Sequence, residues 1–131
     1  MLITKESDYA VRILRALRDG EKRTMPYVCE QENIPHQYAY KIIKKLERAG
    51  LVRSYRGAGG GYTLLKNTAK ITLLDVVSAV DKEALLFECL RHGHHCPMNE
   101  GGKKCRVHME FNRIQNVILS SLKEKSLTEI F

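Results

Sequence analysis

Residues 34–65 read IPHQYAYKIIKKLERAGLVRSYRGAGGGYTLL, and this stretch decides the fold. Its first half repeats apolar residues at helical spacing, which predicts a helix with one buried face that ends at Gly50. Two short runs of β-forming residues follow at 51–55 and 62–65, separated by a glycine-rich turn that begins at Arg56. A helix followed directly by a basic, glycine-tipped hairpin predicts a winged helix-turn-helix, whose polar helix face enters a DNA major groove. The polar side chains on this face are Gln37, Tyr40, Lys41, Lys44 and Arg48.

Basic residues are concentrated in the same part of the chain. Residues 34–70 contain eight Lys or Arg and one acid, Glu47, so their net charge of +7 equals that of the whole chain. A basic excess confined to one structural unit is expected of a surface that binds phosphates. The alternative is a solvated, lysine-rich helix face, but the adjoining basic hairpin favours DNA binding.

The remaining sequence predicts a mainly α-helical protein with the hairpin as its small β element. Thr4 or Ser7 caps a first helix, Thr24 precedes a short second helix, and Thr72 caps a helix after the hairpin. At 131 residues the chain fits one compact domain with a helical extension. Because no apolar run could span a membrane and the N-terminus has no signal-peptide pattern, we expect a cytoplasmic protein.

Residues 88–104 differ from the rest of the chain. They read ECLRHGHHCPMNEGGKK, with three glycines, a proline and few side chains that could pack in a core, which predicts an exposed loop. Three of the four cysteines lie in this segment or directly after it, at Cys89, Cys96 and Cys105. Cys29, in contrast, lies on the expected inner side of the second helix and is interpreted as a core residue.

The three loop cysteines suggest a metal or cluster site. Thiolates are soft ligands that suit iron–sulfur clusters, zinc and cuprous ions. The pattern C-x6-C-x8-C is too widely spaced for a zinc ribbon of C-x2-C pairs. Three thiols leave one ligand position to another group, which is typical of a reactive site. The loop histidines, expected to be solvated, are His92, His94 and His95.

Helical periodicity returns from Arg106 to about Lys125, with apolar residues along one face. One long helix on a small domain leaves such a stripe uncovered, and a helix from a second subunit is its natural cover. We therefore expect a winged helix-turn-helix at residues 1–81, a cysteine loop at 82–105, and a dimerisation helix with a short terminal helix at 106–131. The residues expected at the dimer contact are Phe111, Ile114, Ile118 and Leu122.

The chain resembles the Rrf-two family of bacterial transcription regulators along nearly its whole length. The resemblance rests on TKESDYAVRIL, VRSYRGAGGGYTL, ITLLDVVSAVD and the three cysteines ahead of a long helix; the wing RGAGGGY is the most specific part. It implies a homodimer that binds an imperfect palindrome in double-stranded DNA. Gln37, Tyr40 and Lys41 match the base-reading positions of the family, and Arg56 matches an arginine that enters the minor groove. The DNA-binding prediction also includes Lys44 and Arg48 on the helix, and Gly59, Gly60 and Tyr62 on the wing.

The resemblance also implies an iron–sulfur cluster, because members with three loop cysteines hold one at the places of Cys89, Cys96 and Cys105. Cysteine-free members bind none. The fourth ligand has two candidates: IscR-like members use a histidine at the place of His108, and NsrR-like members use an acid at the place of Asp8, from the other subunit. Asp8 favours the NsrR-like arrangement, and with it a 4Fe–4S cluster over a 2Fe–2S cluster. The loop spacings are longer than those typical of both groups.

The leading hypothesis is a repressor whose operator binding is controlled by a cluster that senses nitric oxide, redox state or iron–sulfur supply. The alternative is a cluster-free regulator of the same fold that senses oxidants or metal through its thiols or through zinc. An enzyme with a cysteine nucleophile would need an apolar pocket with a paired base and an oxyanion donor, and no stretch predicts one. We therefore expect no enzymatic activity.

Overall fold

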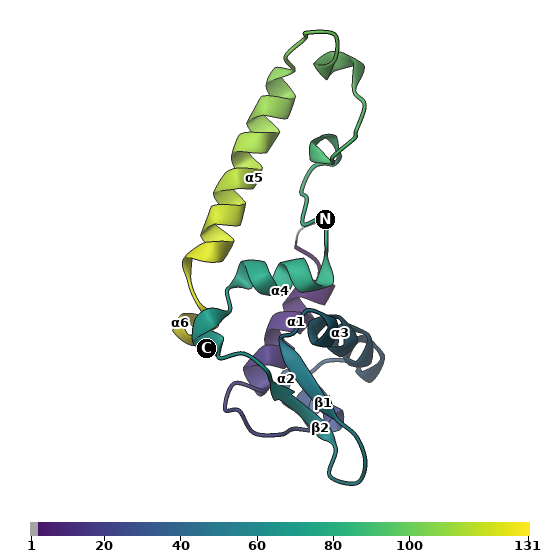
Figure 1. Ribbon diagram of the computed structural model, residues 1–131, viewed down its shortest axis with the longest axis vertical. Coiled ribbons are helices and arrows are strands. Elements are labelled where there is room, and N and C mark those ends of the chain that lie inside the picture. The colour runs from purple at the N-terminus through teal and green to yellow at the C-terminus, as the bar shows by residue number, and fades with distance from the viewer. Residues whose placement is uncertain (1–2) are drawn as a thin grey trace.

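The computed structural model describes residues 3–131 and is mainly α-helical, with one antiparallel hairpin (Figure 1). Three short 3-10 turns lie at Thr68–Lys70, Glu88–Leu90 and Pro97–Asn99. The helices and strands in chain order are α1 (Lys5–Ala16), α2 (Met25–Glu32), α3 (His36–Arg48), β1 (Val52–Tyr55), β2 (Gly61–Leu64), α4 (Leu73–Val80), α5 (Arg106–Glu124) and α6 (Leu127–Ile130).

The first three helices pack around one core, which their amphipathic sequences predict. A reciprocal capping box starts α1: the Thr4 backbone N–H donates to Ser7 Oγ at 2.8 Å, and the Ser7 N–H donates to Thr4 Oγ1 at 3.4 Å. Asn33, in the left-handed conformation with φ of 52°, ends α2 and turns the chain toward α3. The fully buried large side chains of this region are Ile13, Leu14, Leu17, Met25, Val28, Ile42, Ile43 and Leu46.

The hairpin pairs β1 with β2 in register from Val52 opposite Leu64 to Tyr55 opposite Gly61. A third segment joins its outer edge. The Arg23 backbone N–H donates to the Tyr62 carbonyl at 3.0 Å, and the Tyr62 N–H donates back at 2.8 Å. The connection between α1 and α2 is therefore part of the wing.

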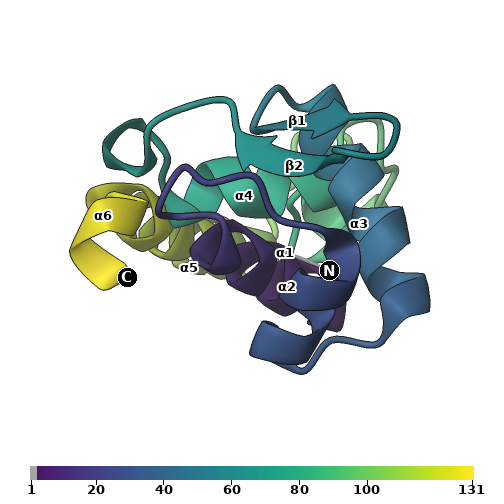
Figure 2. The same cartoon turned by 90° about the horizontal axis from the view of Figure 1, so that it is seen from below.

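The last part of the chain leaves this core and returns to it. α5 projects away from the winged helix with the cysteine loop beside it, and α6 lies against the opposite side of the core from α3 (Figures 1 and 2). Leu127 of α6 is fully buried in the core, and its backbone N–H donates to the Ile71 carbonyl at 2.7 Å. The Ser126 N–H donates to Glu129 at 2.7 Å, which completes a capping box.

The expected fold class, a winged helix-turn-helix with a long C-terminal helix, is confirmed. α1 ends at Ala16, about a turn before Asp19 and Gly20. No helix within residues 3–131 is long and apolar enough to cross a membrane.

Candidate nucleic-acid interface and cysteine pocket

α3 separates its residues cleanly into a buried face and an exposed face. Ala39, Ile42, Ile43 and Leu46 are at most 1% exposed, because this side packs against α1, α2 and α4. The opposite side forms one solvent-facing polar surface, on which every side chain expected to read DNA is exposed. These residues are Gln37, Tyr40, Lys41, Lys44 and Arg48.

Two lysines of α3 share one carboxylate of α1. Lys41 Nζ lies 2.9 Å from Glu6 Oε1, and Lys45 Nζ lies 2.5 Å from Glu6 Oε2. Hydrogen bonds from Lys45 and then from Lys41 lower the pKa of Glu6 below its ordinary value, and the Glu6 carboxylate raises the pKa of Lys41. The sequence analysis missed Glu6, because residues so far apart meet only when α1 packs across α3.

The wing residues divide by exposure. Arg56 and Gly59 are exposed, and Gly60 is half-buried where the turn folds back on itself. A Cβ atom on Gly60 would lie 2.6 Å from the Tyr55 carbonyl oxygen and 2.9 Å from that of Gly57, so this turn requires glycine. Tyr62 is half-buried against the core, and burial raises the pKa of its phenol.

The wing carries two further cations outside the predicted DNA-binding set, and one of them, Lys22, also lies outside the basic stretch 34–70. Lys22 lies on the segment that pairs with β2, and its Nζ is 5.5 Å from the centre of the Tyr55 ring. Arg53 approaches the same ring, with its guanidinium carbon 5.9 Å from the centre. Such cation–π contacts hold both charges beside the wing. No local signal marks Lys22, since its place depends on pairing between residues 23 and 62.

The three loop cysteines line one cavity of about 330 Å³. Each of them is half-buried, and His108 of α5 lines the same cavity together with His94. Apolar neighbours, among them Phe111, close part of its wall. Thiols with an imidazole around one partly apolar cavity are a donor set that suits an iron–sulfur cluster. Within residues 3–131, however, no three His, Cys, Asp or Glu side chains are grouped so as to hold a single metal ion.

Contacts to α5 hold the cysteine loop in place. The Leu86 backbone N–H donates to Gln115 Oε1 at 3.0 Å, and Gln115 is only 7% exposed. The Phe87 ring stacks on the Phe111 ring with a centroid distance of 3.8 Å. Nearer the end of the loop, the Cys105 N–H donates to Asn99 Oδ1 at 3.1 Å. These contacts therefore fix the start of the loop to α5.

The other candidate ligands lie in different surroundings. Asp8 is exposed on α1, pairs with Arg12 at 3.0 Å, and does not line the cysteine cavity of its own chain. His95 pairs with Glu100 at 3.2 Å, and His92 is exposed. Cys29 is buried in the core as expected, and burial raises the pKa of its thiol.

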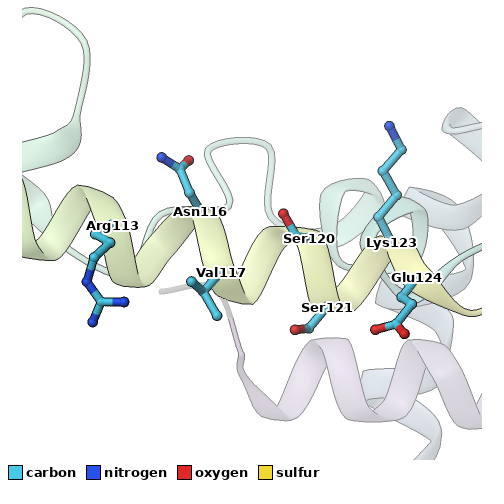
Figure 3. A pocket seen from close by; sticks show the side chains of 7 residues that line it. All are labelled: Arg113, Asn116, Val117, Ser120, Ser121, Lys123 and Glu124. Carbon is cyan, nitrogen blue, oxygen red and sulfur yellow. The ribbon is translucent and has the colours of Figure 1, made fainter.

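α5 leaves much of its surface uncovered. Its expected contact residues Phe111, Ile114, Ile118 and Leu122 are half-exposed, and Val107 is 57% exposed. A shallow groove of about 850 Å³ runs along the adjoining face, with Val117 54% exposed within it. Figure 3 shows the side chains that line the groove: Arg113, Asn116, Val117, Ser120, Ser121, Lys123 and Glu124.

Comparison with known proteins extends over the whole described chain. The model of the Rrf2 family, described as an iron-dependent transcriptional regulator, matches residues 3–131. The transcriptional regulator IscR of Vibrio atlanticus (strain LGP32) is 32% identical over 99% of this chain and 75% of its own length. Protein aau3 of Rhizobium meliloti (strain 1021) is 29% identical over 99% of this chain and 84% of its own.

Solved structures agree on the fold. IscR of T. potens superposes with a TM-score of 0.76 at 19% identity, covering 99% of this chain and 85% of that one. CymR, the global cysteine regulator of B. subtilis, superposes with a TM-score of 0.73 at 20% identity, covering 99% and 95%. The chain belongs to the Rrf2 family and is a transcriptional regulator, not an enzyme.

Proposed function

We propose that this regulator binds a palindromic operator as a homodimer, represses transcription, and is controlled by an iron–sulfur cluster held by Cys89, Cys96 and Cys105. The observation that carries the proposal is the shared cavity of these three thiols, which His108 also lines. Because the chromosome is its target, we place the protein in the cytoplasm.

The exposed face of α3 is the proposed base-reading surface, with Gln37, Tyr40 and Lys41 toward base edges and with Lys44 and Arg48 on phosphates. Arg56, exposed at the tip of the wing, would enter the flanking minor groove. Gly59, Gly60 and Tyr62 shape the wing so that its backbone can approach the DNA.

The homodimer is supported by the half-exposed apolar stripe of α5, formed by Phe111, Ile114, Ile118 and Leu122. A second copy of α5 would cover this stripe and place two recognition helices on one duplex. Half-sites of a palindrome lie roughly 34 Å apart, so a small rotation between subunits would misalign one α3 with its groove.

An iron–sulfur cluster would supply redox-active iron that also reacts with nitric oxide. The fourth ligand is either His108, supported by its position on the cavity wall, or Asp8 of a second subunit. This chain's own residues would couple the site to DNA binding. Gln115 and Phe111 of α5 contact the start of the loop. At the end of α4, where the chain leaves toward the loop, Lys45 Nζ of the recognition helix donates to the Val80 carbonyl at 3.1 Å.

One observation favours the cluster-free alternative. The three loop thiols are half-exposed, so oxidants can reach them without any metal. In that case disulfide formation or zinc binding within the loop would change DNA binding through the same contacts.

The test is an absorption spectrum with iron and acid-labile sulfide assays on protein purified without oxygen. Structured visible absorption with two irons per subunit would indicate a 2Fe–2S cluster and favour His108. A broad shoulder with four irons would indicate a 4Fe–4S cluster and favour Asp8. Colourless protein without sulfide after reconstitution would reject the cluster and support thiol or zinc sensing.

A matched pair of variants sharpens this test. Cys96→Ala should abolish the visible absorption, whereas Cys29→Ala, which removes a buried thiol outside the cavity, should keep it. Apo and holo protein should then bind one operator with different affinity at fixed salt. Equal affinity would show that the cluster does not control DNA binding.

A further inference from the structure

We propose that Glu6 of α1 is a specificity-determining positioning residue, which holds Lys41 on the recognition helix and withholds the charge of this lysine from DNA phosphates. The inference rests on the proposed use of α3 to read an operator. It adds to that function a residue of α1, outside the recognition helix and the wing.

Each carboxylate oxygen of Glu6 contacts a different lysine. Oε1 lies 2.9 Å from Lys41 Nζ and Oε2 lies 2.5 Å from Lys45 Nζ. The two lysines differ in accessibility: the Lys45 side chain is 29% exposed and also donates to the Val80 carbonyl, whereas the Lys41 side chain is 65% exposed. Lys45 is therefore a structural partner, and Lys41 still faces solvent.

Lys41 keeps donors for a second partner. A lysine ammonium has three N–H donors, and Glu6 occupies one, so two remain for the acceptors on a guanine edge. The ion pair limits the positions that the Lys41 ammonium can take before DNA arrives. A base edge in the correct place can be contacted at once, whereas a phosphate elsewhere would have to compete with Glu6.

Neighbouring cations on the same face are not restrained in this way. Within residues 3–131, no acid pairs with Lys44 or Arg48, and both are exposed. These two residues can bind the phosphates of any sequence. Among the exposed cations of the recognition helix, Glu6 thus restrains Lys41 and leaves Lys44 and Arg48 free, which favours discrimination over non-specific affinity.

Removing the negative charge should release Lys41 and shift binding toward any phosphate. Each phosphate contact adds about 0.9 to the slope of log affinity against log salt. We therefore expect Glu6→Gln to bind a scrambled duplex about three- to ten-fold more tightly, with a steeper slope by about one unit. The ratio of operator to scrambled affinity should fall by a similar factor.

The operator probe is a duplex that the wild-type protein recovers by selection from a random-sequence pool; the reference probe is a scrambled duplex of the same composition. Glu129→Gln is the matched control. It removes one negative charge, preserves the capping box because glutamine also serves there, and lies on α6, across the molecule from α3 (Figures 1 and 2). This control should keep the wild-type affinity ratio and salt slope.

A double-mutant cycle separates positioning from general structural damage. In a Lys41→Gln background, Glu6→Gln should no longer change the affinity ratio. If the change persists there undiminished, Glu6 acts through the fold and the inference is wrong. Thermal unfolding of each variant shows whether the substitution has changed the stability of the fold.

The outcomes also distinguish a failure of the proposed DNA-binding function from a failure of the proposed role of Glu6. If selection recovers no common sequence, sequence-specific binding itself is wrong. If selection succeeds but Glu6→Gln matches Glu129→Gln in ratio and slope, only the role of Glu6 is wrong.

Discussion

Gly60 lies at the tip of the wing, in a place where any side chain would meet backbone. Its ideal Cβ position is 2.6 Å from the Tyr55 carbonyl oxygen, and a backbone atom cannot move aside as a flexible side chain can. Gly59, its neighbour, has only Lys22 Nζ nearby, at 3.7 Å. Two adjacent glycines of one motif therefore serve different purposes: Gly60 is required for closure of the turn, and Gly59 leaves its surface open.

We expect Gly60→Ala to destabilise the fold by roughly 1–3 kcal/mol, because the tip must distort to make room for the methyl group. The free energy of unfolding from urea titration measures the effect. Gly59→Ala is the control for stability and should unfold close to the wild-type midpoint. Equal midpoints for both variants would mean that the turn relaxes without cost.

Glu6 also predicts how stability depends on pH. Its pKa is lowered in the folded protein by Lys45 and Lys41, so the unfolded chain binds a proton first as pH falls. The stabilisation is complete above the ordinary glutamate pKa of about 4.3 and is lost as pH falls through the lowered folded value. Wild-type protein should thus lose more stability in this acidic range than Glu6→Gln does, by thermal unfolding across pH. Parallel curves for the two proteins would contradict the ion pair.

At the scale of elements, the wing is a two-stranded hairpin whose edge is joined by a third segment at a single β-bridge. Two backbone hydrogen bonds join Arg23 to Tyr62, and Lys22 and Arg53 both approach the ring of Tyr55. An isolated two-stranded hairpin is marginally stable in water, so the third segment gives the wing a fixed position beside α3. It also brings the positive charge of Lys22 to the same surface.

We expect Lys22→Ala to weaken binding to all DNA sequences alike and to reduce the salt slope by about one unit, as for a phosphate contact. Fluorescence anisotropy at several salt concentrations, with operator and scrambled duplexes, measures both quantities. Lys125→Ala, at the end of α5, is the control for net charge. A change of sequence preference in Lys22→Ala would place this lysine on a base edge instead.

The difference between local signals and contacts between elements explains which features the sequence could predict. Elements with local signals were predicted well: the helix caps at Thr4 and Thr72, the amphipathic α3, and the glycine-rich turn. The exposed set on α3 follows directly from helical periodicity. Glu6 and Lys22 could not be predicted, because their partners are set by packing of α1 on α3 and by strand pairing. The three loop cysteines were grouped into one predicted site by their gathering in a segment without core residues and by family resemblance. The cavity that they line could not be predicted, since loops carry no periodic signal.

At the scale of the whole molecule, the chain leaves the winged helix after α4 and is fastened to it again at α6. Leu127 is fully buried in the same core as α1 and α3, and the Thr68 and Thr128 hydroxyls hydrogen-bond at 2.7 Å. The last residues of the chain thus contribute to the stability of the part that binds DNA.

We expect Leu127→Ala to destabilise the protein by roughly 2–5 kcal/mol, as for other leucines removed from a core. Ile130→Ala, on the same short helix but 40% exposed, should cost much less. Chemical unfolding followed by circular dichroism compares the two. If the variants were equally stable, α6 would not be part of the cooperative core.

The segment between α4 and α6 is attached to the core at both ends, and this attachment determines what happens when a protease cuts the segment. Lys103 and Lys104 are exposed in the cysteine loop, where a protease such as trypsin can cleave. The C-terminal fragment would still hold Leu127 in the core, and the N-terminal fragment would still contain α1 to α4. The two pieces of a nicked chain should therefore elute together as one particle and separate only on denaturation, although no peptide bond joins them any longer.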